Sequence, residues 1–183
     1  MEYCYDCSVK EFHYNRGYSL WLYDSTMRQS MVDFKYNGRK EYAQYYIEEL
    51  VAHLGDEITY LKPDVIIPIP VHPSRRRQRG YNQAELIAKE LSKKMQIHIR
   101  NDILIRTIKT RPQKELSNVE RIKNLERAFS VKQTGEDYTK YRKVLLIDDI
   151  YTTGSTMEAC AKVLQSVGMR EIYFVTLCIG QGF

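Results

Sequence analysis

The sequence lacks the long apolar runs of a membrane protein and the leader of a secreted one. No stretch approaches the ~18 consecutive apolar residues that a helix needs to cross a bilayer. The opening MEYCYDC is not a signal peptide. The chain has only four cysteines, which do not form the pattern of a disulfide framework in a chain of this size. We therefore expect a cytoplasmic protein with no insertion into a membrane.

Length and composition are those of one globular domain. A chain of 183 residues is long enough to enclose a hydrophobic core, with a small appendage. It is 43% hydrophobic and 28% charged, which excludes a disordered chain. The net charge of +5 favours anionic partners, which include polyphosphates and nucleic acids. Charge alone does not choose between these two classes.

Residues 144–156 combine a buried strand with an anion-binding helix start. Residues 144–147 are Val, Leu, Leu and Ile without polar alternation, which predicts a strand covered on both faces, as in a parallel sheet. Asp148 and Asp149 follow directly, in position to accept hydrogen bonds from the hydroxyls of a sugar. The small residues after them favour a phosphate site where the next helix begins, because backbone amides and hydroxyls converge there. These small residues are Thr152, Thr153, Gly154, Ser155 and Thr156.

Three other interpretations of the acidic pair explain less. A Walker B strand also ends in two aspartates, but the chain has no G-x-x-x-x-G-K-S/T motif. A receiver domain carries paired aspartates as well, but only residues 150–183 remain for the rest of that fold, which is too few. A role for Asp148 as a helix N-cap would leave Asp149 and the hydroxyl residues unexplained.

A second anion site is predicted where the strand at residues 64–70 ends. An arginine-rich loop with one glycine follows it, and a helix with an apolar stripe begins at Ala84. Guanidinium groups bind phosphates well, so pyrophosphate is the first candidate ligand. Single-stranded nucleic acid, stacked on Tyr81, is the second, and a solvated basic turn is the plain alternative. The loop carries Arg75, Arg76, Arg77, Arg79 and Gly80.

The remaining segments alternate between strand and helix patterns. Helices are predicted at 41–54 and 157–167, and further strands at 102–106 and 171–178. Residues 17–35 are consistent with short strands or with a strand and a helix turn. This alternation predicts an α/β fold with a doubly wound, mostly parallel sheet and a site at the carboxyl ends of the strands.

A long polar segment, residues 107–127, interrupts the alternation. Segments of this length in a compact domain are usually functional. One interpretation is a lid that excludes water from a reacting substrate. The other is a surface excursion that ends in a helix at 118–125.

The amino-terminal residues 1–16 carry a C-x-x-C pair, Cys4 and Cys7, at the spacing of a zinc knuckle. A structural zinc site needs four ligands, so the pair supplies half of them, and His13 is a candidate third. Two reduced thiols on a tail are the alternative. We treat residues 1–16 as a truncated zinc-knuckle-like segment and 17–183 as the main domain.

Three segments together resemble a known family. LLIDDIYTTGSTMEAC resembles the phosphoribosyl-diphosphate (PRPP) signature of the type I phosphoribosyltransferases. IPIPVHPSRRRQRGYNQAELIAKEL is similar to the P-x-P…R-x-R-G-[FY]-N-Q segment of the ComF family. RTIKTRPQKELSNVERIKNLERAF is similar to the R-T…Q…L-S…R…N…A-F stretch of that family. The resemblance covers most of residues 64–175 and implies the type I phosphoribosyltransferase fold.

The resemblance implies a role for each matching residue. Asp148 and Asp149 would hold the ribose 2′- and 3′-hydroxyls, and residues 152–156 would hold the 5′-phosphate. Arg79 and Gly80 would meet the pyrophosphate. Mg²⁺ would arrive mostly on PRPP itself, since this ion prefers substrate phosphates to an all-protein cage. The lid would contain Arg106, Arg111 and Gln113.

The resemblance also implies a biological setting. ComF-like proteins are linked to DNA uptake in natural transformation, and a zinc-binding head with more than one C-x-x-C usually precedes their phosphoribosyltransferase domain. Only Cys4 and Cys7 match that head, so a zinc site is expected to be incomplete. Two functions follow: a phosphoribosyltransferase that uses PRPP with an unidentified acceptor, or a non-catalytic adaptor on the same fold. The adaptor would hold single-stranded DNA or a competence helicase.

Overall fold

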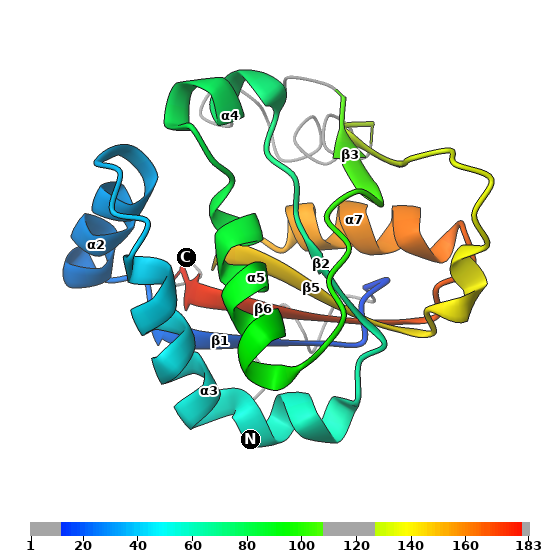
Figure 1. Ribbon diagram of the computed structural model, residues 1–183, viewed down its shortest axis with the longest axis horizontal. Coiled ribbons are helices and arrows are strands. Elements are labelled where there is room, and N and C mark those ends of the chain that lie inside the picture. The colour runs from blue at the N-terminus through cyan, green and yellow to red at the C-terminus, as the bar shows by residue number, and fades with distance from the viewer. Residues whose placement is uncertain (1–11, 108–126, 181–183) are drawn as a thin grey trace.

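The core of the protein is a four-stranded sheet in the order β1-β6-β5-β2 (Figure 1). The computed structural model describes residues 12–107 and 127–180. The strands are β1 (Arg16–Leu22), β2 (Val65–Pro68), β5 (Lys143–Tyr151) and β6 (Glu171–Ile179). Every pairing between them is parallel. The predicted α/β fold with a mostly parallel sheet is confirmed.

β5 lies in the interior of the sheet because both of its faces are apolar. Val144 and Leu146 belong to one hydrophobic core, and Leu145 and Ile147 belong to a second core on the opposite face. All four side chains are completely buried. Because alternate strand residues point to opposite faces, a doubly covered strand requires an unbroken apolar run.

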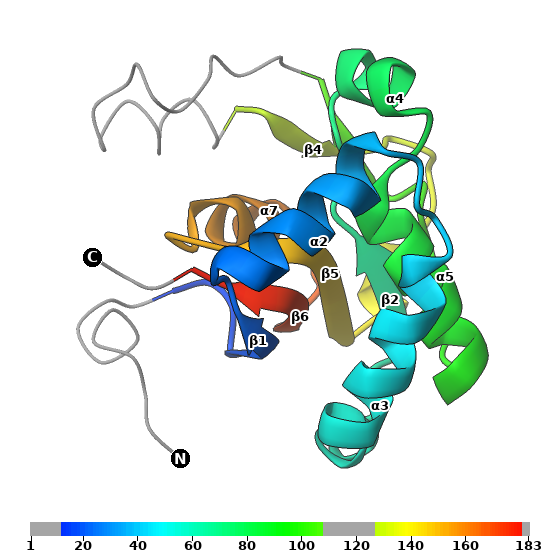
Figure 2. The same ribbon diagram turned by 90° about the vertical axis from the view of Figure 1, so that its left-hand side faces the viewer.

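Helices cover both faces of this sheet, which makes it doubly wound (Figure 2). α7 (Ser155–Gln165) packs on one face. α3 (Tyr42–Leu61) and α5 (Gln83–Met95) pack on the other. α2 (Ser25–Tyr36) lies across the end of the sheet where the strands finish (Figure 2). The segment predicted as short strands or a strand and a helix turn is therefore β1 followed by α2.

The predicted strand at 102–106 does not join the main sheet. β3 (Leu104–Arg106) pairs antiparallel with β4 (Phe129–Val131) in a separate two-stranded sheet. The segment 98–100, which precedes β3 in the chain, lies along the outer edge of β2 instead. The Ile66 N–H donates to His98 O at 2.7 Å, and the Arg100 N–H donates to Ile66 O at 2.9 Å. Because this segment already occupies the place beside β2, β3 pairs elsewhere.

The prediction of a loop for the arginine-rich segment is wrong. The segment forms a short helix, α4 (Pro73–Arg79). Pro73 stands at the start of the helix, and the His72 side chain accepts a hydrogen bond from the Ser74 N–H at 3.2 Å. Gly80 ends it with a φ of 81°. These are ordinary start and stop signals of a helix. α4 buries none of its residues, so no apolar stripe marked it in the sequence.

The segment before β1 is part of the packed domain from residue 12 onward. Tyr14 is buried, and its ring meets the Phe174 ring edge-on at 5.0 Å between centroids. The Asn15 N–H donates to Ile172 O at 2.7 Å. A 3-10 turn, η2 (Tyr138–Lys140), precedes β5. Within the described ranges, no helix is both long and apolar enough to span a membrane.

Candidate functional site

The loop after β5 has the backbone that a phosphate site needs. Gly154 adopts a φ of 74°, a conformation that side chains rarely take, and α7 begins directly after it. A Cβ at Gly154 would lie 2.6 Å from the Tyr151 hydroxyl and 3.2 Å from the Tyr14 hydroxyl. These two hydroxyls are 3.1 Å apart. The position therefore requires glycine twice, for its φ and for its lack of a side chain.

The first turn of α7 presents donors that have no side-chain cap. Thr152 and Thr153 are exposed, and the Thr153 and Ser155 hydroxyls are 2.9 Å apart. The Glu158 N–H is the first one bonded back into the helix, to Gly154 O at 2.9 Å. The amides before it are the orphan donors of a helix start, where the helix dipole also favours an anion. The loop thus gathers amides and hydroxyls at one point.

The two aspartates differ in their surroundings. Burial and the neighbouring Asp149 carboxylate raise the pKa of Asp148 well above its usual range. Asp148 Oδ1 accepts a hydrogen bond from the Asp149 N–H at 2.9 Å. Asp149 Oδ2 lies 2.8 Å from Lys35 Nζ, and only 14% of the Asp149 side chain is exposed. The pair therefore combines a carboxyl that resists ionisation with a carboxylate held in an ion pair.

Lys35, at the end of α2, was not predicted from the sequence as a site residue. Its side chain is 17% exposed. Burial alone would lower the pKa of Lys35, but the Asp149 carboxylate raises it above its ordinary value, so the ammonium stays charged. Its position depends on packing between residues far apart in the chain, and no local motif marks it.

Arg79 stands on the other side of the site, on α4. Its guanidinium donates to the Tyr36 hydroxyl at 2.9 Å and to Gln83 Oε1 at 3.2 Å. It also stacks on the Tyr36 ring, 4.8 Å from the centroid. Gly80 follows it and donates its N–H to Arg76 O at 2.8 Å. Tyr36 is the second site residue that the sequence did not reveal.

The structure also brings Arg106 toward the acidic pair. Its guanidinium lies 5.0 Å from the centroid of the Phe129 ring. Burial and the charge of Arg75 lower the pKa of Arg106, and Asp148 acts in the opposite direction, so both groups are within electrostatic reach. The other predicted lid residues, Arg111 and Gln113, lie outside the described residues.

The four candidate nucleic-acid arginines do not form one uniform patch. Arg76 Nη2 lies 3.1 Å from Glu85 Oε2, and Arg79 is half-buried against Tyr36. Arg75 and Arg77 are exposed, and neither forms an ion pair with any other residue that the structure describes. The free positive charge of α4 is therefore carried mainly by these last two.

The predicted zinc ligands Cys4 and Cys7 lie outside the described residues. His13, the candidate third ligand, binds Glu158 of α7 through Nδ1. In ranges 12–107 and 127–180, no group of three or more His, Cys, Asp or Glu side chains is placed to hold a metal ion. Cys160 and Cys178 are free and completely buried.

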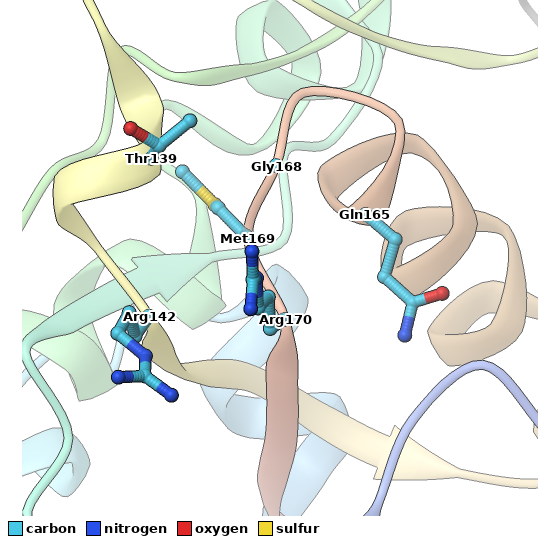
Figure 3. A pocket seen from close by; sticks show the side chains of 6 residues that line it. All are labelled: Thr139, Arg142, Gln165, Gly168, Met169 and Arg170. Atoms are coloured by element: carbon cyan, nitrogen blue, oxygen red, sulfur yellow. The ribbon is translucent and has the colours of Figure 1, made fainter.

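A separate open pocket of about 640 Å³ lies at the opposite ends of the strands from the candidate site (Figure 3). Arg142 and Arg170, which line it, directly precede β5 and β6, so the pocket lies at the amino ends of these strands. Gln165 and Met169 also line it. The acidic pair lies at the other end of β5, so this pocket is not part of the candidate site.

Comparison with known proteins gives the family. A model of the phosphoribosyl transferase domain matches residues 47–181. The chain belongs to the phosphoribosyltransferase family. The matched range contains α4 and the loop after β5, whereas β1 and α2 precede it. Lys35 and Tyr36 therefore lie outside the matched range.

Curated relatives place this chain in the ComF group. Competence protein F of Haemophilus influenzae is 32% identical over 179 residues, which cover 93% of this chain and 76% of that protein. Competence protein ComFC of Bacillus subtilis is 28% identical over 176 residues, which cover 90% of this chain and 67% of that protein. DNA utilization protein YhgH of Escherichia coli O157:H7 is 33% identical over 116 residues, covering 63% of this chain and 49% of that protein. The resemblance inferred from the sequence motifs is confirmed.

Proposed function

We propose that this protein binds PRPP, with Mg²⁺, at the carboxyl ends of the strands of its main sheet. The observation that supports this best is the loop after β5, where Gly154 opens an uncapped helix start only a few residues beyond two carboxylates. The 5′-phosphate would bind the α7 amides and the hydroxyls of residues 152–156. The ribose hydroxyls would donate to Asp148 and Asp149. The diphosphate would extend toward Arg79 and Gly80.

The proposed reaction is phosphoribosyl transfer, with catalysis by electrostatic stabilisation. The bond between ribose C1 and the diphosphate breaks, the diphosphate leaves with the electron pair, and an acceptor nitrogen bonds to C1 and releases its proton to solvent. Positive charge that develops on C1 would be stabilised by the nearby Asp149 carboxylate, and charge on the leaving group by Arg79 and Arg106. We propose an amine or a base as the acceptor class.

The residues present fit Mg²⁺ that is carried by the ligand. Among the residues that the structure describes, Asp148 and Asp149 are the two carboxylates proposed to hold the ribose, and Lys35 already neutralises one of them. This is too small a donor set for an all-protein Mg²⁺ cage and suits an ion that is held chiefly by substrate phosphates. Bound there, Mg²⁺ would neutralise the diphosphate.

Calorimetry with PRPP and Mg²⁺ tests the proposal. The parent chain should bind PRPP, and the variant Asp148→Asn/Asp149→Asn should lose measurable binding because neutral amides accept sugar hydroxyls less strongly. The matched control is Asp56→Asn/Glu57→Gln, which removes the charges of another adjacent acidic pair, on α3. The control should bind like the parent chain. PRPP binding that survives in the double asparagine variant would refute the proposed site.

A second candidate function is single-stranded DNA binding by a non-catalytic adaptor, with a competence helicase as a further partner. The exposed guanidinium groups of Arg75 and Arg77 support it, as do the names of the relatives, which refer to competence and DNA utilization. Phosphate contacts of this kind weaken as salt rises. Fluorescence anisotropy with oligo-dT should show weaker binding by Arg75→Gln/Arg77→Gln and a steep salt dependence. The double asparagine variant should bind oligo-dT like the parent chain.

We further propose that either activity serves DNA uptake during natural transformation. The support is the relationship to competence protein F and competence protein ComFC. Zinc binding by Cys4 and Cys7 also belongs to this proposal, and measurement of zinc in the purified chain before and after Cys4→Ser/Cys7→Ser tests it. Equal zinc content in both would exclude these two ligands.

A further inference from the structure

The last turn of α2 contacts both halves of the candidate site with two consecutive residues. Lys35 Nζ lies 2.8 Å from Asp149 Oδ2, in the proposed ribose half. The Tyr36 hydroxyl accepts from Arg79 Nη2 at 2.9 Å, in the proposed diphosphate half. α2 precedes the range that the family model matches, so nothing in that match assigns a role to it.

The positive charges here exceed the negative partners available to them. Arg79 donates only to neutral oxygens, those of Tyr36 and Gln83, and forms no ion pair with another described residue. Its Nε is buried and has no hydrogen-bond partner in the described part of the chain. Buried donors without partners are rare and call for an explanation. A bound anion would supply the missing acceptor.

Lys35 directly precedes Tyr36, the residue that binds Arg79, so both cations meet the site beside the last turn of α2. The charge of Arg79 acts to lower the pKa of Lys35, whereas Asp149 and Asp148 act to raise it. The Lys35 ammonium therefore lies within electrostatic reach of the acidic pair and of the unsatisfied guanidinium. A lysine can change partners, because its ammonium is a compact charge on a flexible four-carbon stem.

We propose that Lys35 is a diphosphate-binding residue and that it exchanges partners when PRPP binds. Without ligand, Lys35 neutralises Asp149. When the ribose hydroxyls occupy Asp149, the Lys35 ammonium moves to the diphosphate oxygens beside Arg79. This inference depends on the proposed PRPP site and adds to it a selectivity for ligands that carry a diphosphate on C1.

Comparison of PRPP with ribose 5-phosphate tests the exchange, because the second ligand has the same 5′-phosphate and diol without the diphosphate. In calorimetry with Mg²⁺, Lys35→Gln should weaken PRPP binding by about tenfold to a hundredfold, the range for the loss of a charge-assisted hydrogen bond. Its affinity for ribose 5-phosphate should stay the same or rise, because this ligand must displace Lys35 from Asp149 and offers no diphosphate in exchange. Lys35→Arg retains the charge and should recover most of the PRPP affinity.

The control is Lys93→Gln, which removes an exposed lysine of α5 that pairs with Glu90. It should bind both ligands like the parent chain. An equal loss of both ligands in Lys35→Gln would overturn the exchange, because Lys35 would then act only through Asp149. Unchanged binding of both ligands would mean that Lys35 has only a structural role, and it would overturn the proposed exchange as well. If the parent chain binds neither ligand, the proposed PRPP site itself fails; if it binds both, only the role of Lys35 is in question.

Discussion

Replacement of Gly154 by alanine gives the most direct test of the phosphate loop, because the structure predicts two separable costs. The first is the left-handed backbone at a φ of 74°, which costs an alanine about 1–2 kcal/mol. The second is the new Cβ, which would lie 2.6 Å from the Tyr151 hydroxyl. Overpacking of this kind costs about 1–3 kcal/mol. Together, Gly154→Ala should lower the free energy of unfolding by about 2–5 kcal/mol.

Gly135 provides a matched control for the backbone cost. Its φ is 75°, and a Cβ built on it meets no atom within 4 Å. Gly135→Ala should therefore lower the free energy of unfolding by the backbone cost alone, about 1–2 kcal/mol. Any gain from a less flexible unfolded chain is the same in both variants and cancels in the comparison. Urea denaturation followed by circular dichroism measures both values.

Tyr151→Phe tests the largest part of the second cost. It removes the hydroxyl that the new Cβ would approach and leaves the ring, which stacks on Phe174. Gly154→Ala should therefore be less destabilising in the Tyr151→Phe background than in the parent chain. Gly154→Ala should also abolish PRPP binding, whereas Gly135→Ala should preserve it. If Gly154→Ala costs no more than Gly135→Ala and still binds PRPP, the close approach described here does not shape the loop.

Two further predictions concern strand packing and pH. Gly17→Ala should lower the free energy of unfolding by about 1–3 kcal/mol, because its Cβ would lie 1.9 Å from the Phe174 ring. In urea denaturation, Phe174→Leu in the Gly17→Ala background should recover part of this loss. No recovery would contradict a clash with Phe174 as the cause. The pKa of Asp148 is higher in the folded than in the unfolded chain, so its stabilising effect is present at acid pH and is lost as the pH rises through the folded pKa. Asp148→Asn should therefore raise Tm at pH 8 and flatten the fall of Tm between acid and neutral pH; parallel Tm curves for parent and variant would contradict the assigned shift.

The strand and loop at residues 144–156 could be predicted from the sequence because every signal there is local. The unbroken apolar run predicts a strand covered on both faces, and Val144 and Leu145 are indeed completely buried. Gly154 among small hydroxyl residues predicts a positive φ at a helix start, as observed. The Asp pair directly follows the buried run, so its position at the end of the strand could be predicted from the local sequence alone.

The cationic side of the site could not be predicted in the same way. Lys35 and Asp149 are far apart in the sequence, and their ion pair depends on how α2 packs across the sheet. Pro73 and Gly80 are helix start and stop signals, but α4 buries no side chain and so has no apolar period. On its outer edge, β2 forms a single isolated bridge between Ile66 and Ile99. The sequence around Ile99 has no strand pattern that would predict this bridge.

The position of the site follows from where β2 ends. Pro68 pairs with Ile147, and the last bond of this ladder runs from the Ile69 N–H to Ile147 O at 2.9 Å. β2 itself ends at Pro68, whereas β6 stays paired with β5 as far as Tyr151. The acidic pair therefore begins at the first residue of β5 that has lost its neighbour on one side. The chain also reaches β5 after packing α5 on one face and leaves it into α7 on the other. In open α/β sheets the crevice for a ligand forms outside the carboxyl ends of the strands, where connections diverge in this way.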